Sequence, residues 1–174
     1  MEIPMTRFVA LLRAVNVGGT GKLPMAELKA MCLDAGFAQV ETYIASGNAV
    51  FECEAAEAQV KAALEARLLA FAGKAVGVAV RTAAEMQAVL ARNPFPQAAA
   101  KHTVAIFLDE QPPSDALDRV LGRNGEELSL GEREIFVHYG SGMGQSKLRI
   151  PAARSGTARN MNTIARLAEM AASL

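Results

Sequence analysis

A glycine-rich loop, Asn16-Val17-Gly18-Gly19-Thr20-Gly21-Lys22, is the segment of the sequence best suited to bind a ligand. Glycines let several backbone N–H groups point toward one centre, and the N-terminus of a following helix adds partial positive charge. Lys22 would complete a site for an anion. The phosphate loop of nucleoside triphosphatases needs Gly, and Ser or Thr, where Asn16 and Leu23 stand, and the dinucleotide fingerprint also fails. The loop therefore predicts anion binding, with a plain surface turn as the alternative.

A second loop, Gly140-Ser141-Gly142-Met143-Gly144-Gln145-Ser146-Lys147, repeats the combination of glycines and one lysine. A long loop leaving a hairpin has the same composition, so the structural and the binding interpretations are equally supported. If both loops face one cleft, Lys22 and Lys147 would hold one ligand together.

Polar residues cluster at Arg159, Asn160, Asn162 and Thr163, where the apolar spacing predicts the start of a last helix over residues 157–172. One such residue is enough to cap a helix. Four exceed that need, so the cluster predicts contact with a ligand or between lobes, with capping alone as the alternative.

Two further features allow both a structural and a binding interpretation. Ser46-Gly47-Asn48 has the residue types of a tight hairpin turn, which is its simpler explanation. Arg13 interrupts an apolar run and must reach water, an acidic side chain or a ligand, and pairing with an acidic side chain is the simplest of these.

Several kinds of chemistry lack support in the sequence. His102 and His138 do not stand at metal-ligand spacing from Cys, Asp or Glu, so no metal site is predicted. Ser46-Gly47 lacks the Gly-x that precedes the serine of a hydrolase elbow. Cys32 and Cys53 fit small buried hydrophobic residues better than a disulfide or a catalytic thiol. The sequence therefore leaves open whether the protein is an enzyme, and it identifies no cofactor.

The composition limits the partners. A chain of 174 residues suits one domain or two small lobes. Its 18 basic and 18 acidic residues balance, so no overall field attracts nucleic acid or an anionic membrane. No stretch approaches the ~20 apolar residues of a membrane span, and no signal peptide opens the sequence. We expect a cytoplasmic protein without a membrane partner, and its oligomeric state is left open.

The elements that would carry these loops follow the order β-α-β-β-α-β in the first half, which is the ferredoxin-like order. Apolar patterns predict strands at residues 8–15, 40–45, 49–53 and 76–80, and helices at 24–36 and 55–72. A short helix at 83–92 precedes Asn93-Pro94-Phe95-Pro96, which breaks regular structure. The first half therefore predicts a ferredoxin-like N-terminal lobe over residues 1–96.

The second half repeats this order without its final strand. It predicts a strand at 103–108, a helix beginning near Ser114, a hairpin of 128–130 and 134–139, a short strand at 147–150 and the last helix. The fold class is thus α+β, with a related β-α-β-β-α lobe over residues 97–174.

Four segments and Lys22 follow one another in an order and spacing that resemble the domain-of-unknown-function family numbered 1697. The segments are residues 11–19, 42–48, 144–148 and 159–163. The family consists of uncharacterised, mainly bacterial proteins, so the resemblance implies a compact α+β fold and supplies no activity. The residues on its motif positions, which we predict to bind a ligand, are Arg13, Asn16, Gly18, Gly19, Lys22, Ser46, Gly47, Asn48, Lys147, Arg159, Asn160 and Asn162.

Together these features predict a protein that binds a phosphorylated or other small anionic ligand, a nucleotide included, in a cleft lined by glycine-rich basic loops. Lys22, Lys147 and Arg159 would supply positive charge, and the glycine N–H groups would surround the anion.

Two other functions remain as alternatives. In a nucleic-acid-binding module the strand aromatics Phe8, Tyr43 and Phe51 would stack on bases, but the balanced charge makes this less favoured. The third hypothesis is a structural or dimerisation module without catalysis.

Overall fold

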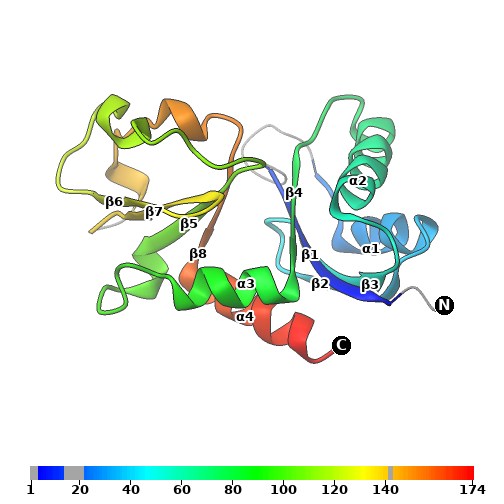
Figure 1. Cartoon of the computed structure of the whole chain (residues 1–174). Coiled ribbons are helices and arrows are strands. Elements are labelled where there is room, and N and C mark those ends of the chain that lie inside the picture. The colour runs from blue at the N-terminus through cyan, green and yellow to red at the C-terminus, as the bar shows by residue number, and fades with distance from the viewer. Residues whose placement is uncertain (1–3, 14–21, 141–142) are drawn as a thin grey trace. The chain divides into compact units, whose positions relative to one another are not determined.

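The computed structural model describes residues 4–13, 22–140 and 143–174, and within them the chain forms an α+β fold (Figure 1). The strands form two four-stranded antiparallel sheets, ordered β2-β3-β1-β4 and β6-β7-β5-β8. The first sheet contains β1 (Thr6–Leu12), β2 (Ala38–Tyr43), β3 (Asn48–Cys53) and β4 (Val78–Thr82). The second contains β5 (Thr103–Phe107), β6 (Glu127–Leu130), β7 (Glu134–His138) and β8 (Thr157–Asn160). The α-helices are α1 (Met25–Asp34), α2 (Glu57–Ala72), α3 (Ala83–Ala91) and α4 (Met161–Ala172).

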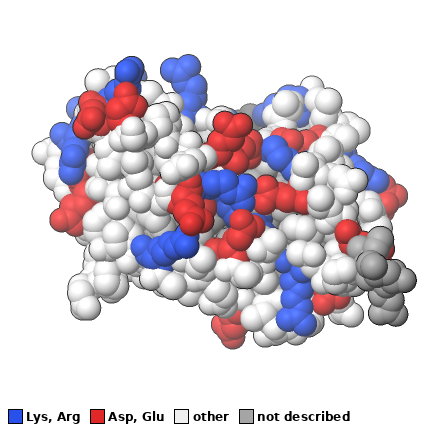
Figure 2. Space-filling model, in the orientation of Figure 1, with Lys and Arg blue, Asp and Glu red and all other residues white. Residues whose placement is uncertain are grey.

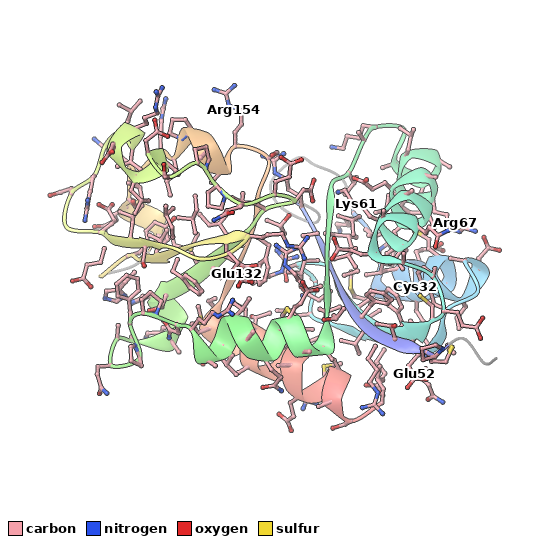
Figure 3. All side chains as sticks on the ribbon, in the orientation of Figure 1. Cys32, Glu52, Lys61, Arg67, Glu132 and Arg154 are labelled. Carbon is pink, nitrogen blue, oxygen red and sulfur yellow. The ribbon has the colours of Figure 1, made fainter. Side chains whose placement is uncertain are left out.

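Helices α1 and α2 pack on one face of the first sheet (Figure 1). Alternate residues of a strand point to the same face, and Phe8, Ala10 and Leu12 of β1 place apolar side chains in the core beneath the two helices. Lys61 ties α2 to the sheet, because its Nζ donates to the carbonyl of Val78 at 2.7 Å (Figure 3).

Phe51 lies in an aromatic group within this core. Its ring stacks on that of Phe37 with centroids 4.3 Å apart and lies 6.1 Å from that of Phe8. All three rings are buried. Phe8 and Phe51 therefore fill the core and do not present the stacking surface that the nucleic-acid hypothesis requires.

The two cysteines are free thiols buried in the same core. Burial raises the pKa of the Cys32 thiol to about 12, so it stays protonated at neutral pH. Both residues pack as small hydrophobic side chains, as their sequence positions indicate.

The second half differs from the sequence prediction at two helices. The last helix begins at Met161, and Thr157–Asn160 form strand β8 instead of its first turn. Four residues are too short for a pattern of period 2 to be told from one of period 3.6, and pairing with β5 decides the matter. Near Ser114 only a 3-10 turn forms, at Ala116–Arg119. Between Pro113 and Gly122 lie residues 114–121, about two α-helical turns, and so short a helix has little stability of its own.

The hairpin predicted in the second half is confirmed as β6 and β7, which pair from Glu127–His138 to Leu130–Ile135. The strand predicted at 147–150 is reduced to one bridge, between Leu121 and Arg149. Loops and 3-10 turns cover the apolar face of this sheet, where Val104, Ile106, Ile135 and Val137 form the core.

The two sheets repeat one strand order and one junction between a strand and a helix. Arg81 of β4 lies opposite Val9 of β1, and Arg159 of β8 lies opposite Ala105 of β5. Strands β4 and β8 occupy the same place in the two strand orders, as do β1 and β5. Both arginines are buried, and each donates from Nη1 to the carbonyl of the residue before it, at 3.0 and 2.9 Å.

The residue after each arginine caps the next helix. Thr82 Oγ1 accepts the N–H of Glu85 at 3.1 Å at the start of α3. Asn160 Oδ1 accepts the N–H of Thr163 at 2.9 Å at the start of α4. Each cap satisfies a backbone donor that the first turn of a helix leaves unpaired.

The chain divides into two compact units, one of Met1–Gln87 with Arg166–Leu174 and one of Ala88–Ala165. The divisions fall inside α3 and α4, so the end of α4 belongs to the first unit. Arg7 of β1 holds that end, donating to the carbonyls of Ala172 at 2.8 Å and Leu174 at 2.5 Å. The lobes 1–96 and 97–174 stay a prediction.

Candidate functional site

A polar pocket of about 240 Å³ lies within the second unit. Its walls come from the turn before β6, from the residue after β7 and from the segment that leads toward β8. The first two walls meet because Glu127 and His138 are paired, so the residues next to them along the chain also lie side by side. The lining residues are Gly122, Asn124, Glu126, Tyr139, Gln145, Ser146 and Lys147.

Glu126 is a buried carboxylate that holds two walls of the pocket together. Its Oε2 accepts the hydroxyl of Ser146 at 2.5 Å, and its Oε1 accepts the backbone N–H of Asn124. The Ser146 hydroxyl, then the Asn124 N–H, and to a smaller extent the charge of Arg123 lower the pKa of Glu126. The carboxylate is therefore ionised at neutral pH.

Tyr139 stands beside this charge as a neutral phenol. Partial burial raises the pKa of its hydroxyl, and the negative charge of Glu126 raises it further. A protonated phenol both donates and accepts hydrogen bonds. The pocket thus has a neutral donor next to an ionised acceptor.

The backbone around Lys147 is fixed on both sides. Before it, Ser146 is bound to Glu126, and the Ser146 Oγ also accepts the N–H of Leu148 at 3.2 Å. After it, Arg149 and Leu121 exchange two backbone hydrogen bonds, at 2.9 and 2.8 Å. Gly122, with φ of 69°, packs so closely that an added Cβ would collide with the Lys147 carbonyl. Among the described residues the exposed ammonium of Lys147 has no ion pair or hydrogen bond.

Because the folded state lowers the pKa of Glu126, its contribution to stability depends on pH. The contribution is fully present above the ordinary glutamate pKa, about 4.3, and is lost as the pH falls through the lower folded-state value. We expect Glu126→Gln to lower the urea midpoint at pH 7, with a difference from wild type that shrinks between pH 5 and pH 3. Glu127→Gln, at the exposed neighbouring residue, is the control and should show no such trend. If Glu126→Gln lowers the urea midpoint by the same amount at pH 7 and at pH 3, this account is contradicted.

The other predicted residues of the second unit, Arg159, Asn160 and Asn162, do not line the pocket. Ala105 of β5 is paired with Arg159 on one side and with Phe136 on the other, so these three side chains point to the same face of the second sheet. Val137 and Tyr139 belong to the apolar cluster on the other face of that sheet. Arg159 therefore does not line the pocket that Lys147 lines, and its predicted binding role stays a prediction. Burial lowers the pKa of Arg159 to about 10, and it remains charged at neutral pH.

Asn160 and Asn162 have different surroundings. Asn160 caps α4, which is the structural alternative considered for this cluster. Asn162 is exposed on the first turn of that helix.

In the first unit, the turn at Ser46–Asn48 has the contacts of a hairpin connection. Asn48 is fully buried, and its Nδ2 donates to the carbonyl of Tyr43 at 2.8 Å and to the Ser46 hydroxyl at 2.9 Å. Gly47 has φ of 91°, which glycine adopts without strain, and its carbonyl accepts the N–H of Leu12 at 2.8 Å. The ligand-binding role predicted for this turn, Ser46–Asn48, stays a prediction.

The two basic residues of the first unit that the sequence predicts to bind a ligand, Arg13 and Lys22, are exposed. Arg13 follows β1, and its N–H donates to the carbonyl of Gly77 at 2.9 Å. Lys22 stands before α1 and has no ion pair with any described residue. Asn16, Gly18 and Gly19 lie outside the described residues, so the binding role of their loop stays a prediction.

Four pocket residues, Gly122, Asn124, Glu126 and Tyr139, are absent from the sequence prediction of the site. The Asn124-Gly125 pair gave a signal, but it indicates a turn and says nothing of binding. Glu126 and Glu127 are indistinguishable in the sequence, although only the first is buried.

The charge pattern offers no broad basic surface in the view drawn. Figure 2 shows Lys and Arg side chains alternating with Asp and Glu side chains over the visible face. A surface that binds a phosphate backbone gathers its basic residues together. Within residues 4–13, 22–140 and 143–174, no three His, Cys, Asp or Glu side chains group as ligands for a metal ion, and no helix has the length and apolarity to cross a membrane.

The chain matches a family of unknown function and resembles a solved bacterial structure. Residues 5–136 match the family described as "Protein of unknown function (DUF1697)". Among solved structures it is similar to the conserved bacterial protein SP0830 from Streptococcus pneumoniae, with 26% sequence identity, a TM-score of 0.77, and coverage of 97% of this chain and 99% of that one. No curated protein matches the chain.

Proposed function

The chain belongs to the DUF1697 family, whose description gives no function, and from that premise we propose that it binds a small anionic ligand through Lys147. One observation carries the proposal: an ammonium without a partner among the described residues stands in a polar pocket, on a backbone segment fixed at both ends. A backbone held in place before binding leaves only the side chain to be ordered when a ligand arrives, which lowers the conformational entropy lost on binding. The Lys147 backbone is therefore preorganised for an anion.

The surrounding groups complete the recognition of such a ligand. The amides of Asn124 and Gln145 and the phenol of Tyr139 are donors from different walls of the pocket. The volume of about 240 Å³ lies below the 300–1,000 Å³ usual for drug-sized ligands. The ligand is thus a compact molecule with one strongly bound acidic group.

The test compares two lysine variants of the whole protein. Lys147→Ala removes the only cation lining the pocket among the described residues, and Lys101→Ala removes an exposed lysine elsewhere in the same unit. Phosphate, glycerol phosphate and small carboxylates are titrated while amide chemical shifts are recorded. A charge-assisted hydrogen bond corresponds to about ten- to hundredfold in affinity. We expect that loss for Lys147→Ala and wild-type affinity for Lys101→Ala. Equal affinity in both variants would reject the proposal.

The loop that ends at Lys22 is part of the same proposal as a second anion site. Its support is the exposed Lys22 ammonium, unpaired among the described residues, before the N-terminus of α1. Binding is proposed for both sites, and no catalytic step is assigned.

Two finer features of the molecule are also proposed. A ferredoxin-like lobe in the first half is supported by its order of elements and by the strand order β2-β3-β1-β4. A cytoplasmic location is supported by two free, buried thiols, which fit a reducing compartment.

A further inference from the structure

Resting on the proposed function, we infer that the Lys147 pocket selects a compact molecule with one negatively charged acidic group and a hydrogen-bond donor beside it, as an α-hydroxy carboxylate or a zwitterionic α-amino carboxylate has, and rejects polyphosphates. Lys147 would bind the acidic group, and Glu126 would accept the donor. Both residues line the same pocket of about 240 Å³, so one small molecule is sufficient to contact both.

Glu126 has hydrogen-bonding capacity left for a ligand. A carboxylate offers about four lone-pair positions. Among the described residues, one is used on Oε1, for the N–H of Asn124, and one on Oε2, for the hydroxyl of Ser146. Because Glu126 lines the pocket while its residue is only 4% exposed, a molecule inside the pocket is well placed to supply a further donor.

The same carboxylate limits the charge that a ligand can bring. Of the residues that the structure describes, Lys147 is the only cation that lines the pocket, and Glu126 is an anion in an adjoining wall of the same pocket. A ligand with one negative charge balances Lys147 and leaves Glu126 bound to donors. Each further negative charge would be held beside Glu126 with no second cation in the described lining to balance it, and like charges a few ångströms apart repel.

Four probes separate these requirements in the wild-type protein. Propionate and lactate differ only in one α-hydroxyl group, and alanine replaces that hydroxyl with an ammonium. Tripolyphosphate brings several negative charges and no such donor. A hydrogen bond to a charged acceptor corresponds to about tenfold or more in affinity. By NMR titration we expect lactate, alanine or both to bind about tenfold more tightly than propionate, and tripolyphosphate to bind most weakly. The lactate and alanine arms decide between a hydroxyl and an ammonium donor.

Glu126→Gln then tests the residue responsible. Glutamine can keep both existing contacts, because its carbonyl can accept from Asn124 while its amide donates to the Ser146 oxygen. We expect the preference over propionate to fall at least threefold and the affinity for tripolyphosphate to rise. Equal binding of lactate, alanine and propionate by wild type would overturn the inference, as would tighter binding of tripolyphosphate. If those results still depend on Lys147, the proposed function survives; if no probe binds in a Lys147-dependent way, both fail.

Discussion

Replacement of Gly122 by alanine is expected to destabilise the second unit by about 2–4 kcal/mol and to abolish ligand binding at Lys147. Its φ of 69° costs about 1 kcal/mol for a residue with a Cβ. The Cβ would also collide with the carbonyl of Lys147, and overpacking of this kind costs about 1–3 kcal/mol. The collision pushes the Lys147 backbone out of its fixed position. Urea unfolding and titration with the anions named above measure the two effects.

Gly125 supplies the matched control, because it lies in the same turn and also has a positive φ, of 86°. A Cβ added to Gly125 would meet no atom of the described residues within 4 Å, so Gly125→Ala carries only the backbone cost of about 1 kcal/mol. The difference between the two variants isolates the contact with Lys147. If both variants lose the same stability, the close approach of Gly122 does not fix this segment.

Phe51→Ala is expected to lower the free energy of unfolding of the first unit by about 3–5 kcal/mol. The ring is fully buried, stacks on Phe37 and contacts the core formed by β1 and the helices. Its removal leaves a cavity that close-packed neighbours fill only in part. The midpoint of urea unfolding, followed by far-UV circular dichroism, measures the loss.

Phe71→Ala is the corresponding control on α2, where the ring is 47% exposed. Removal of a half-exposed ring is expected to cost less than about 1 kcal/mol. A similar cost for Phe51→Ala would show that the stacked rings are not a main source of stability.

The first half of the fold could be predicted from its sequence because its signals are local. Phe8–Leu12 are continuously apolar, and Gly36 and Gly73 end their helices in the positive-φ conformation that glycine favours. The second half has shorter elements, and there non-local pairing decides. Thr157–Asn160 form a strand because β5 offers an edge, which no local pattern in those residues reveals.

The candidate site was predictable only in part for a related reason. A lysine after glycines indicated the segment of Lys147, because loops of this composition can present a charge. Glu126 lies twenty residues before its partner Ser146, and their hydrogen bond depends on the hairpin that intervenes. A contact made by chain reversal cannot be read from either residue alone.

The assignment of Arg166–Leu174 to the first unit bears on how the protein is made. A ribosome releases the chain from its N-terminus, and domains generally fold as they emerge. The carbonyls that Arg7 binds, at Ala172 and Leu174, are synthesised after all of Ala88–Ala165. The contacts of Arg7 with these carbonyls can therefore form only after the whole second unit has been synthesised.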